Sequence, residues 1–149
     1  MDELLEIFQQ DFHTNGLNED GTPLRALIVD DATFIREGIR EILQRVGYEV
    51  VGEAEDVDHA VKAYFELNPD VVTMDLIMPY VTGVEAVEQI CGRDKKAAIV
   101  LVTSVGFNEM VKDGLMKGAR DFVIKPIQES NLERFFKVLK NASLMRLCT

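Results

Sequence analysis

The sequence predicts an α/β fold, in which a doubly wound parallel sheet of five strands is covered by five helices. From residue 24 onward, short apolar runs of strand length alternate with longer stretches whose apolar residues recur at helical spacing. All but one of the runs are almost continuously apolar, which is typical of parallel strands covered on both faces. Regular alternation of strand and helix predicts a parallel sheet with helices packed on both sides.

The elements follow one another in a simple order. The expected strands lie at 24–29, 49–51, 71–74, 97–102 and 122–124. The helical stripes lie at 35–46, 60–67, 84–91, 108–117 and 132–142. The first stripe stops at Gly47 and the second before Pro69, while Thr82 and Glu85 predict a capping box that opens the third. Gly114 lies inside the weakest stripe, so we expect that helix to be the least firmly held.

Charge divides the chain into two parts. The whole chain of 149 residues carries a net charge of −10, of which −6 falls in residues 1–22 and −4 in residues 23–149. We therefore expect an acidic N-terminal arm at 1–22 and one domain at 23–149, a length sufficient for a sizeable core. Residues 14–22 are rich in Gly, Asn and acids and predict a flexible tether.

Composition also excludes several classes of protein. The acidic balance argues against direct nucleic-acid binding, which needs a basic face. No apolar run approaches the roughly 20 residues of a membrane helix, and no signal peptide is visible, so we expect a cytoplasmic protein without membrane insertion. Cys91 and Cys148 are far apart in the sequence, and we interpret both as reduced structural thiols.

Polar residues end four of the five predicted strands. The first run ends in Asp30 and Asp31, the third in Asp75, the fourth in Thr103 and the fifth in Lys125. A single Asp at a strand end is more often a helix cap or a turn residue. All five side chains, however, fall at the carboxyl ends of the strands, where sites form in sheets of this type.

Such a cluster predicts phosphoryl chemistry with a metal. Three adjacent carboxylates repel one another unless a cation lies among them, and an all-oxygen ligand set favours Mg²⁺. One carboxylate can then attack phosphorus. Lys125 and Thr103 would bind the other phosphoryl oxygens, and the product would be an acyl phosphate on a side chain.

These residues resemble the response-regulator receiver family, in particular its stand-alone CheY-like chemotaxis type. The resemblance rests on residues 27–31, 69–79, 100–103 and 118–126, together with Gly83. It spans 24–142 and implies the flavodoxin-like strand order 2-1-3-4-5.

The resemblance also implies a role for each acid. Asp75 matches the phosphoacceptor. Asp31 matches the direct Mg²⁺ ligand and Asp30 the acid that holds the metal through water. The backbone carbonyl of Ile77 completes the protein ligands.

The remaining site residues match a switch. Thr103 corresponds to the hydroxyl that moves toward the phosphoryl group, and Phe122 to the aromatic residue that follows it inward. Lys125 corresponds to the phosphoryl-binding ammonium, and a cis Lys125–Pro126 bond is expected to orient it.

The implied function is two-component signal transduction. A histidine kinase would donate the phosphoryl group, and the product would bind a target, with a flagellar motor switch component as the first choice. A single-domain phosphorelay intermediate, or another receiver-only adaptor, is the alternative. Ile77 and Val105 are apolar and would shield the acyl phosphate from water, so a partner phosphatase is expected. Tyr80, Val81 and Thr82 depart from the residues common after Met-Pro in the family, which bears on partner identity.

The site residues argue against three competing functions. An aspartyl phosphatase of the haloacid-dehalogenase type needs a second acid two residues after its nucleophile, where this chain has Ile77, so we do not expect an enzyme. A flavodoxin-like cofactor carrier needs a phosphate-binding loop after the first strand, where Asp30 and Asp31 would repel phosphate. An interaction module without phosphorylation would have little need for all five site residues.

The N-terminal arm is expected to act as a separate docking or regulatory element. Leu4, Leu5, Phe8 and Phe12 share one arc of a helical wheel, with Ile7 beside it. A helix this short needs a surface to cover. The resemblance indicates the face made by the fourth helix, fifth strand and fifth helix. The alternative is a disordered chain end.

Overall fold

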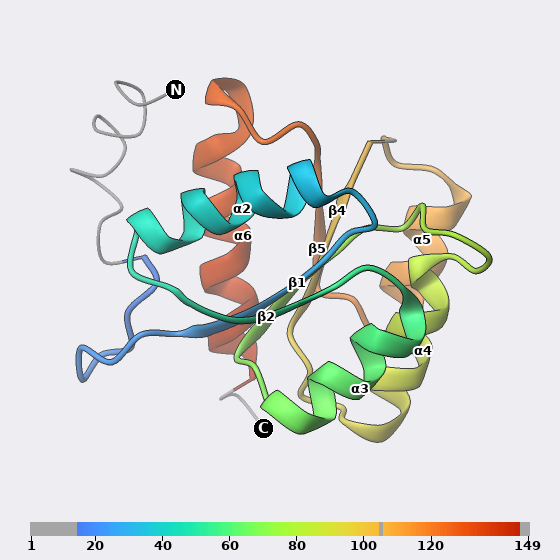
Figure 1. The fold of residues 1–149 in the computed structure, drawn as a ribbon, viewed down its shortest axis with the longest axis horizontal. Coiled ribbons are helices and arrows are strands. Elements are labelled where there is room, and N and C mark those ends of the chain that lie inside the picture. The colour runs from blue at the N-terminus through green and yellow to red at the C-terminus, as the bar shows by residue number, and fades with distance from the viewer. Residues whose placement is uncertain (1–14, 105, 147–149) are drawn as a thin grey trace.

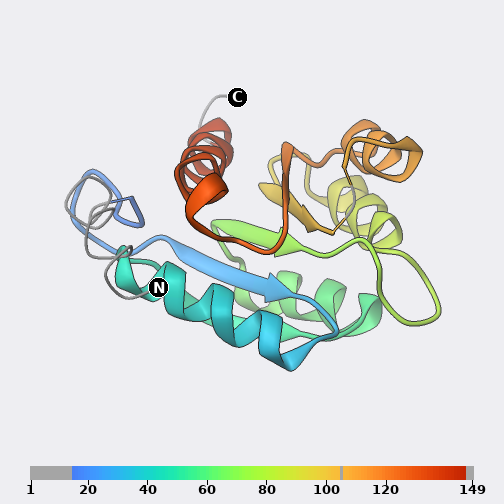
Figure 2. The ribbon, with the colours of Figure 1, turned by 90° about the horizontal axis from the view of Figure 1, so that it is seen from above.

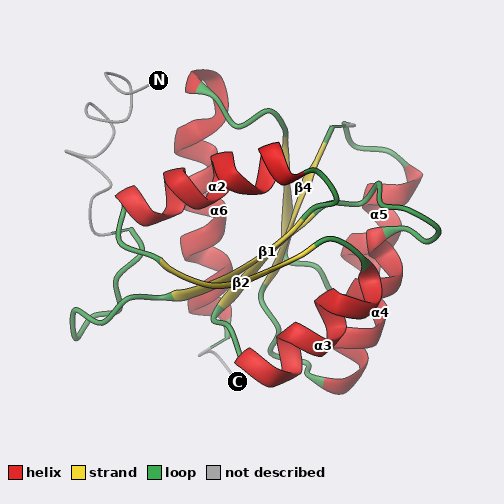
Figure 3. Cartoon of the chain, in the orientation of Figure 1, coloured by secondary structure: helices red, strands yellow, loops and turns green. Residues whose placement is uncertain are grey.

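The computed structural model describes residues 15–104 and 106–146. Within these residues five strands and five helices alternate (Figures 1 and 3). In order they are β1 (Arg25–Val29), α2 (Thr33–Arg45), β2 (Glu49–Ala54), α3 (Val57–Leu67), β3 (Val71–Met74), α4 (Gly83–Arg93), β4 (Ile99–Thr103), α5 (Glu109–Met116), β5 (Asp121–Ile124) and α6 (Glu129–Met145). The predicted fold class is confirmed. Among these helices, none combines the length and the apolar composition needed to cross a bilayer.

The sheet has the strand order β2-β1-β3-β4-β5, and every pair is parallel, as predicted. Its register aligns the strand ends that matter for function. Val29 lies opposite Met74, and Met74 lies opposite Leu101. The residues that follow Val29 and Met74 therefore leave the sheet at the same level. Thr103 lies opposite Ile124 on the neighbouring pair, which brings the end of β4 beside the end of β5.

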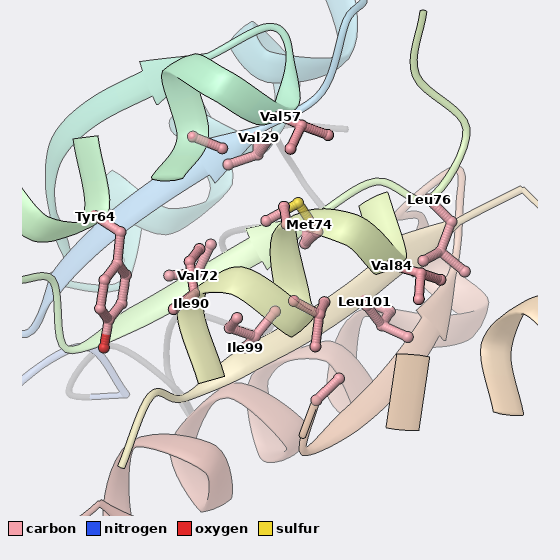
Figure 4. Packing of buried hydrophobic residues seen from close by; sticks show 14 of the residues in the cluster. Val29, Val57, Tyr64, Val72, Met74, Leu76, Val84, Ile90, Ile99 and Leu101 are labelled. Carbon is pink, nitrogen blue, oxygen red and sulfur yellow. The ribbon is translucent and has the colours of Figure 1, made fainter. Parts of the chain in front are cut away.

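Successive residues of each strand pack against opposite layers of helices. In β1, Ala26 and Ile28 belong to a core shared with α2 and α6. Leu27 and Val29 belong to the other core, which the sheet shares with α3, α4 and α5. Figure 4 shows part of this second core, including the strand residues Val72, Met74, Ile99 and Leu101. Burial on both faces explains why the strands are almost continuously apolar in sequence.

The helix ends differ from the sequence prediction in one respect. Thr82 occupies the N-cap position of α4, but its side chain makes no capping hydrogen bond, so the predicted capping box is not formed. Backbone bonds fix this end instead, with the amide of Gly83 donating to the carbonyl of Leu76 at 2.8 Å. A capping box does form at α6, between Gln128 and Asn131.

Residues 15–24 form a turn that packs against the domain, which we call the N-terminal turn. Leu17 and Pro23 form an antiparallel bridge. The side chain of Asn15 donates to the carbonyl of Phe136 in α6 at 3.1 Å and accepts from the Tyr48 hydroxyl at 2.8 Å. In the described residues 15–22 the structure therefore shows an attached turn where a flexible tether was expected. The predicted arm helix and Val105 lie outside the described residues.

Candidate functional site

The end of β1 supplies two carboxylates with different surroundings. Asp30 is buried and Asp31 is exposed. The Asp30 amide continues the sheet by donating to the carbonyl of Ala54 at 3.1 Å, which fixes its backbone. One carboxylate oxygen of Asp30 accepts from the amide of Ala32 at 2.9 Å, just before α2 begins. The side chain is thus held at the edge of the sheet.

The end of β3 supplies the third carboxylate. Asp75 is buried, and its amide donates to the carbonyl of Val29 at 2.9 Å. Its carboxylate accepts from the amide of Ile77 at 3.3 Å. Gly83, the first residue of α4, lies against the same peptide: a Cβ placed there would stand 2.1 Å from the Asp75 carbonyl oxygen. Only glycine therefore allows this approach of α4 to the site.

We call Asp30, Asp31 and Asp75 the acid triangle. Each offers one carboxylate oxygen, and these oxygens lie within 4.8 Å of one another. Burial, reinforced by the charge of Asp30, raises the pKa of Asp75 to about 6, against the lowering effects of Lys125 and the Ile77 amide. The triangle therefore carries unfavourable charge that a cation would relieve.

Lys125 partly neutralises the acid triangle from the end of β5. Its ammonium lies 2.8 Å from Asp30 and 3.4 Å from Asp75. Burial acts to lower the pKa of Lys125, but the hydrogen bond to Asp30 and the charges of both acids outweigh it and raise that pKa. The Lys125–Pro126 peptide is cis, as expected.

Thr103 and Phe122 lie on the two strands next to the triangle. Thr103 is fully buried at the end of β4, and its carbonyl accepts from the Lys125 amide at 2.8 Å. Phe122 is half-buried, with its ring centre 6.1 Å from that of Phe107. The guanidinium carbon of Arg134 lies 5.6 Å from the Phe122 ring centre, and Arg134 donates to the Phe122 carbonyl at 2.8 Å. The switch roles of Thr103 and Phe122 stay predictions.

Two arginines near the site were not found from the sequence. Arg36 donates to the carbonyl of Asp30 at 2.6 Å and so helps to fix the end of β1. Arg134 lies against Phe122, as described above. Each arginine lies on a helix and contacts a residue outside that helix. Their positions along the helices therefore did not indicate that they lie near the site. The exposed Ile77 and Tyr80 border the site on the loop after β3.

The donor set fits Mg²⁺. All three acids of the triangle offer oxygen, and one of them is exposed and able to meet a hydrated ion. Among the described residues, no His or Cys belongs to the cluster, which argues against softer metals. The ligand role expected of the Ile77 carbonyl stays a prediction, while the Ile77 amide is committed to Asp75.

Comparisons with known proteins agree with this geometry. A family model described as the response regulator receiver domain matches residues 26–137, which include every residue of the candidate site. The Chemotaxis protein CheY of Thermotoga maritima is 44% identical over 117 residues, which cover 78% of this chain and 98% of that protein. The Chemotaxis protein CheY of Treponema pallidum is 39% identical over 143 residues, 90% of this chain and 99% of that protein.

A solved structure is also similar over most of the chain. In the crystal structure of the CheX-CheY-BeF3-Mg complex from Borrelia burgdorferi, the matched chain has a TM-score of 0.78 and 34% identity. The match covers 85% of this chain and 97% of that one.

Proposed function

The chain belongs to the response regulator receiver family, and on that premise we propose that Asp75 accepts a phosphoryl group and that the phosphorylated protein binds a target. The observation that carries this proposal is the acid triangle with Lys125 bridging Asp30 and Asp75. A buried acid that lies close to a second acid does not stabilise the fold. The same arrangement is what a phosphoacceptor beside a metal ion requires.

In the proposed reaction a carboxylate oxygen of Asp75 bonds to phosphorus while the bond between phosphorus and a histidine nitrogen of the donor breaks. The acids of the triangle and the Ile77 carbonyl would hold Mg²⁺, which when bound neutralises charge on the phosphoryl oxygens. Lys125, already 3.4 Å from Asp75, is placed to pair with a phosphoryl oxygen. The Thr103 hydroxyl would bind another oxygen and so favour the active conformation, with Phe122 following.

The pathway follows from the relatives. Two of them are named chemotaxis proteins and are matched over nearly their whole length. We infer a cytoplasmic messenger of two-component signalling in chemotaxis, with a histidine kinase as donor and a flagellar motor switch component as target. A similar chain from Borrelia is found in complex with CheX, which supports a further protein partner at the phosphorylated state. The phosphatase expected from Ile77 is one such partner.

We also propose that the chain is not an enzyme acting on other molecules. The residue two positions after Asp75 is Ile77, which cannot protonate a leaving group. The only phosphoryl transfer would then be to Asp75 itself, followed by hydrolysis.

Phosphorylation of Asp75 can be tested with a small phosphodonor. Intact-mass measurement of the protein incubated with acetyl phosphate and Mg²⁺ is expected to show one added phosphoryl group, and none when Mg²⁺ is chelated. Asp75→Asn is expected to abolish the addition. Asp58→Asn, an exposed acid on α3, is the matched control and is expected to react like the unaltered protein. Full phosphorylation of Asp75→Asn would show that another residue is the acceptor.

A further inference from the structure

The connection between β1 and α2 carries two acids of the triangle. β1 ends at Val29 and α2 begins at Thr33, so Asp30 and Asp31 lie in the short link between these elements. Figures 1 and 2 both show α2 running back beside β1 in the opposite direction, from the edge of the sheet at which the link lies. The peptide between Asp30 and Asp31 is planar, so its orientation decides how the two side chains are directed relative to each other.

Hydrogen bonds fix Asp30 on both sides of its Cα atom. On the amino side, the Asp30 amide donates to the carbonyl of Ala54 in β2 at 3.1 Å. On the carboxyl side, the Asp30 carbonyl belongs to the peptide shared with Asp31 and accepts from Nη1 of Arg36 at 2.6 Å. The first bond continues the sheet, whereas the second is made by a side chain of α2. Arg36 therefore sets the plane of the peptide that leads to Asp31.

Two further bonds hold Arg36 in place. Its Nε donates to Oε1 of Glu53 in β2 at 3.0 Å, and its Nη2 donates to the Thr33 hydroxyl at 3.2 Å. Only 13% of the Arg36 side chain is exposed. The planar fork of a guanidinium can reach three acceptors in fixed directions, whereas a lysine ammonium has no such fork. Arg36 is thus fixed between β2 and the start of α2.

The bond from Arg36 leaves the Asp30 carboxylate to other partners. That carboxylate accepts from the Ala32 amide at 2.9 Å and from the Lys125 ammonium at 2.8 Å. The charge of Arg36 is paired with Glu53. Arg36 therefore fixes Asp30 through a backbone oxygen that the proposed Mg²⁺ site does not use.

We propose that Arg36 is a positioning residue that raises the affinity of the acid triangle for Mg²⁺ by fixing the peptide between Asp30 and Asp31. This inference rests on the proposed function, because it takes the triangle as the Mg²⁺ site. Ligands that are already held in the binding orientation lose less entropy when the ion arrives. Replacing a residue that orients the ligands of a metal without touching the metal typically lowers metal affinity by about tenfold or more.

The charge of Arg36 and its positioning role have opposite effects on Mg²⁺ binding. A positive charge near the triangle repels a cation, so charge alone would make Mg²⁺ bind more tightly when Arg36 is replaced by a neutral residue. Loss of the bond to the Asp30 carbonyl would make Mg²⁺ bind more weakly. The direction of the change in affinity therefore separates the two effects.

Mg²⁺ titrations followed by the NMR amide signals of residues 30–32 and 75–77 test the proposal. Arg36→Gln is expected to raise the dissociation constant of Mg²⁺ about tenfold. Arg36→Lys keeps the charge but not the fork of donors, and is expected to raise the dissociation constant as well. If Arg36→Gln does not fold, as judged from its amide spectrum without Mg²⁺, Arg36→Lys decides the question.

Arg40→Gln is the matched control. Arg40 lies one helical turn after Arg36 and donates to the same Glu53, with Nε 3.0 Å from Oε2. Either substitution to Gln removes one positive charge and leaves Glu53 with the other arginine as its partner. Arg40→Gln is expected not to raise the dissociation constant of Mg²⁺. An equal rise in Arg40→Gln, or an unchanged or lower dissociation constant in Arg36→Gln, would overturn the proposal.

Phosphorylation by acetyl phosphate gives a second readout. Arg36→Gln is expected to need about tenfold more Mg²⁺ for half of its maximal rate, and to reach the rate of the unaltered chain at saturating Mg²⁺. A general loss of folded protein would instead lower the rate at every Mg²⁺ concentration. The titrations need no phosphodonor, so the failure of Asp75 as phosphoacceptor and the failure of this proposal would appear in different measurements.

Discussion

The two ends of the sheet treat their carboxylates in opposite ways. At the carboxyl end, Asp30, Asp31 and Asp75 crowd together, and Lys125 pairs with both Asp30 and Asp75. The pKa of Asp75 rises to about 6 mainly because it is buried. At the amino end, Asp70 and Asp94 each have partners of their own. The same sheet therefore stores unfavourable charge at one end and relieves it at the other.

The amino end shows how acids are stabilised. Asp70 accepts from the Arg25 amide at 2.8 Å and from the Arg146 guanidinium at 2.9 Å. Asp94 accepts from the Tyr64 hydroxyl at 2.5 Å and from the Lys96 amide. Burial acts to raise the pKa of Asp94, but these hydrogen bonds outweigh it and lower that pKa.

The comparison separates acids that hold the fold from acids that do chemistry. An acid whose charge is already balanced by hydrogen bonds and ion pairs gains little free energy from binding a cation. Charges that are crowded make the binding of a cation favourable, since the cation removes a cost already present in the protein. Three predictions test this distinction, in order of decreasing size, and a fourth and smaller one concerns the loop after β3.

The largest effect is expected at the amino end. Asp70→Ala removes the acceptor of the Arg25 amide and leaves the half-buried guanidinium of Arg146 without its acid. We expect the free energy of unfolding to fall by about 2–3 kcal/mol, measured by urea denaturation. Asp70→Asn keeps an acceptor for the Arg25 amide and is expected to lose less. Equal stability of Asp70→Ala and the unaltered chain would contradict the assignment of Asp70 as a structural acid.

At the carboxyl end, replacing an acid is expected to raise the free energy of unfolding rather than lower it. The pKa of Asp75 is about 6 in the folded chain and about 4 when unfolded. Its ionisation therefore costs stability, and that cost grows as pH rises from about 4 to above 6. In chelator, Asp75→Asn is expected to be more stable than the unaltered chain by about 1–2 kcal/mol at pH 8, and nearly equal at pH 4. Urea denaturation at both pH values measures this difference.

A smaller effect is expected from the metal. When its concentration is several times its dissociation constant, Mg²⁺ is expected to raise the free energy of unfolding of the unaltered chain by about 1 kcal/mol, measured by thermal unfolding. Asp31→Asn removes one acid of the triangle and is expected to lose most of this gain. The gain is also expected to fade below pH 6, because protons then compete for Asp75. A gain of the same size in Asp31→Asn would place the ion elsewhere.

The smallest effect concerns the loop after β3. Tyr80 is fully exposed and has a φ of 72°, a left-handed conformation that is unfavourable for a tyrosine. Tyr80→Gly is expected to raise the free energy of unfolding by about 0.5 kcal/mol, because glycine adopts this φ without strain but loses more entropy on folding. Tyr80→Ala serves as the control and is expected to bring no gain. Destabilisation by the glycine would show that the Tyr80 ring packs usefully.

The sequence predicted the strands and the site for a single physical reason. Parallel strands buried on both faces must be apolar, so the first polar residue after each run marks the strand's end. Asp30 and Asp75 were found in this way, and the register of β1 and β3 brings them together. β2 was predicted too short, because it continues through Gly52 and Glu53 to Ala54, residues that do not read as an apolar strand.

Contacts between distant residues could not be predicted. The partner of Asn15 in α6 is 121 positions away, and nothing local to residues 14–22 distinguishes an attached turn from a tether. Thr82 and Glu85 have the spacing of a capping box, but the approach of Gly83 to the Asp75 backbone decides how α4 begins. In both cases tertiary contacts, rather than the local sequence pattern, determine the structure.

The attachment of the N-terminal turn has a consequence for the order of events during synthesis. Asn15 is synthesised 121 residues before its partner Phe136, and Leu17 123 residues before its partner Lys140. Loops of that length close slowly, and domains complete their folding only when such distant contacts form. The N-terminal turn can therefore be secured only after α6 has been synthesised.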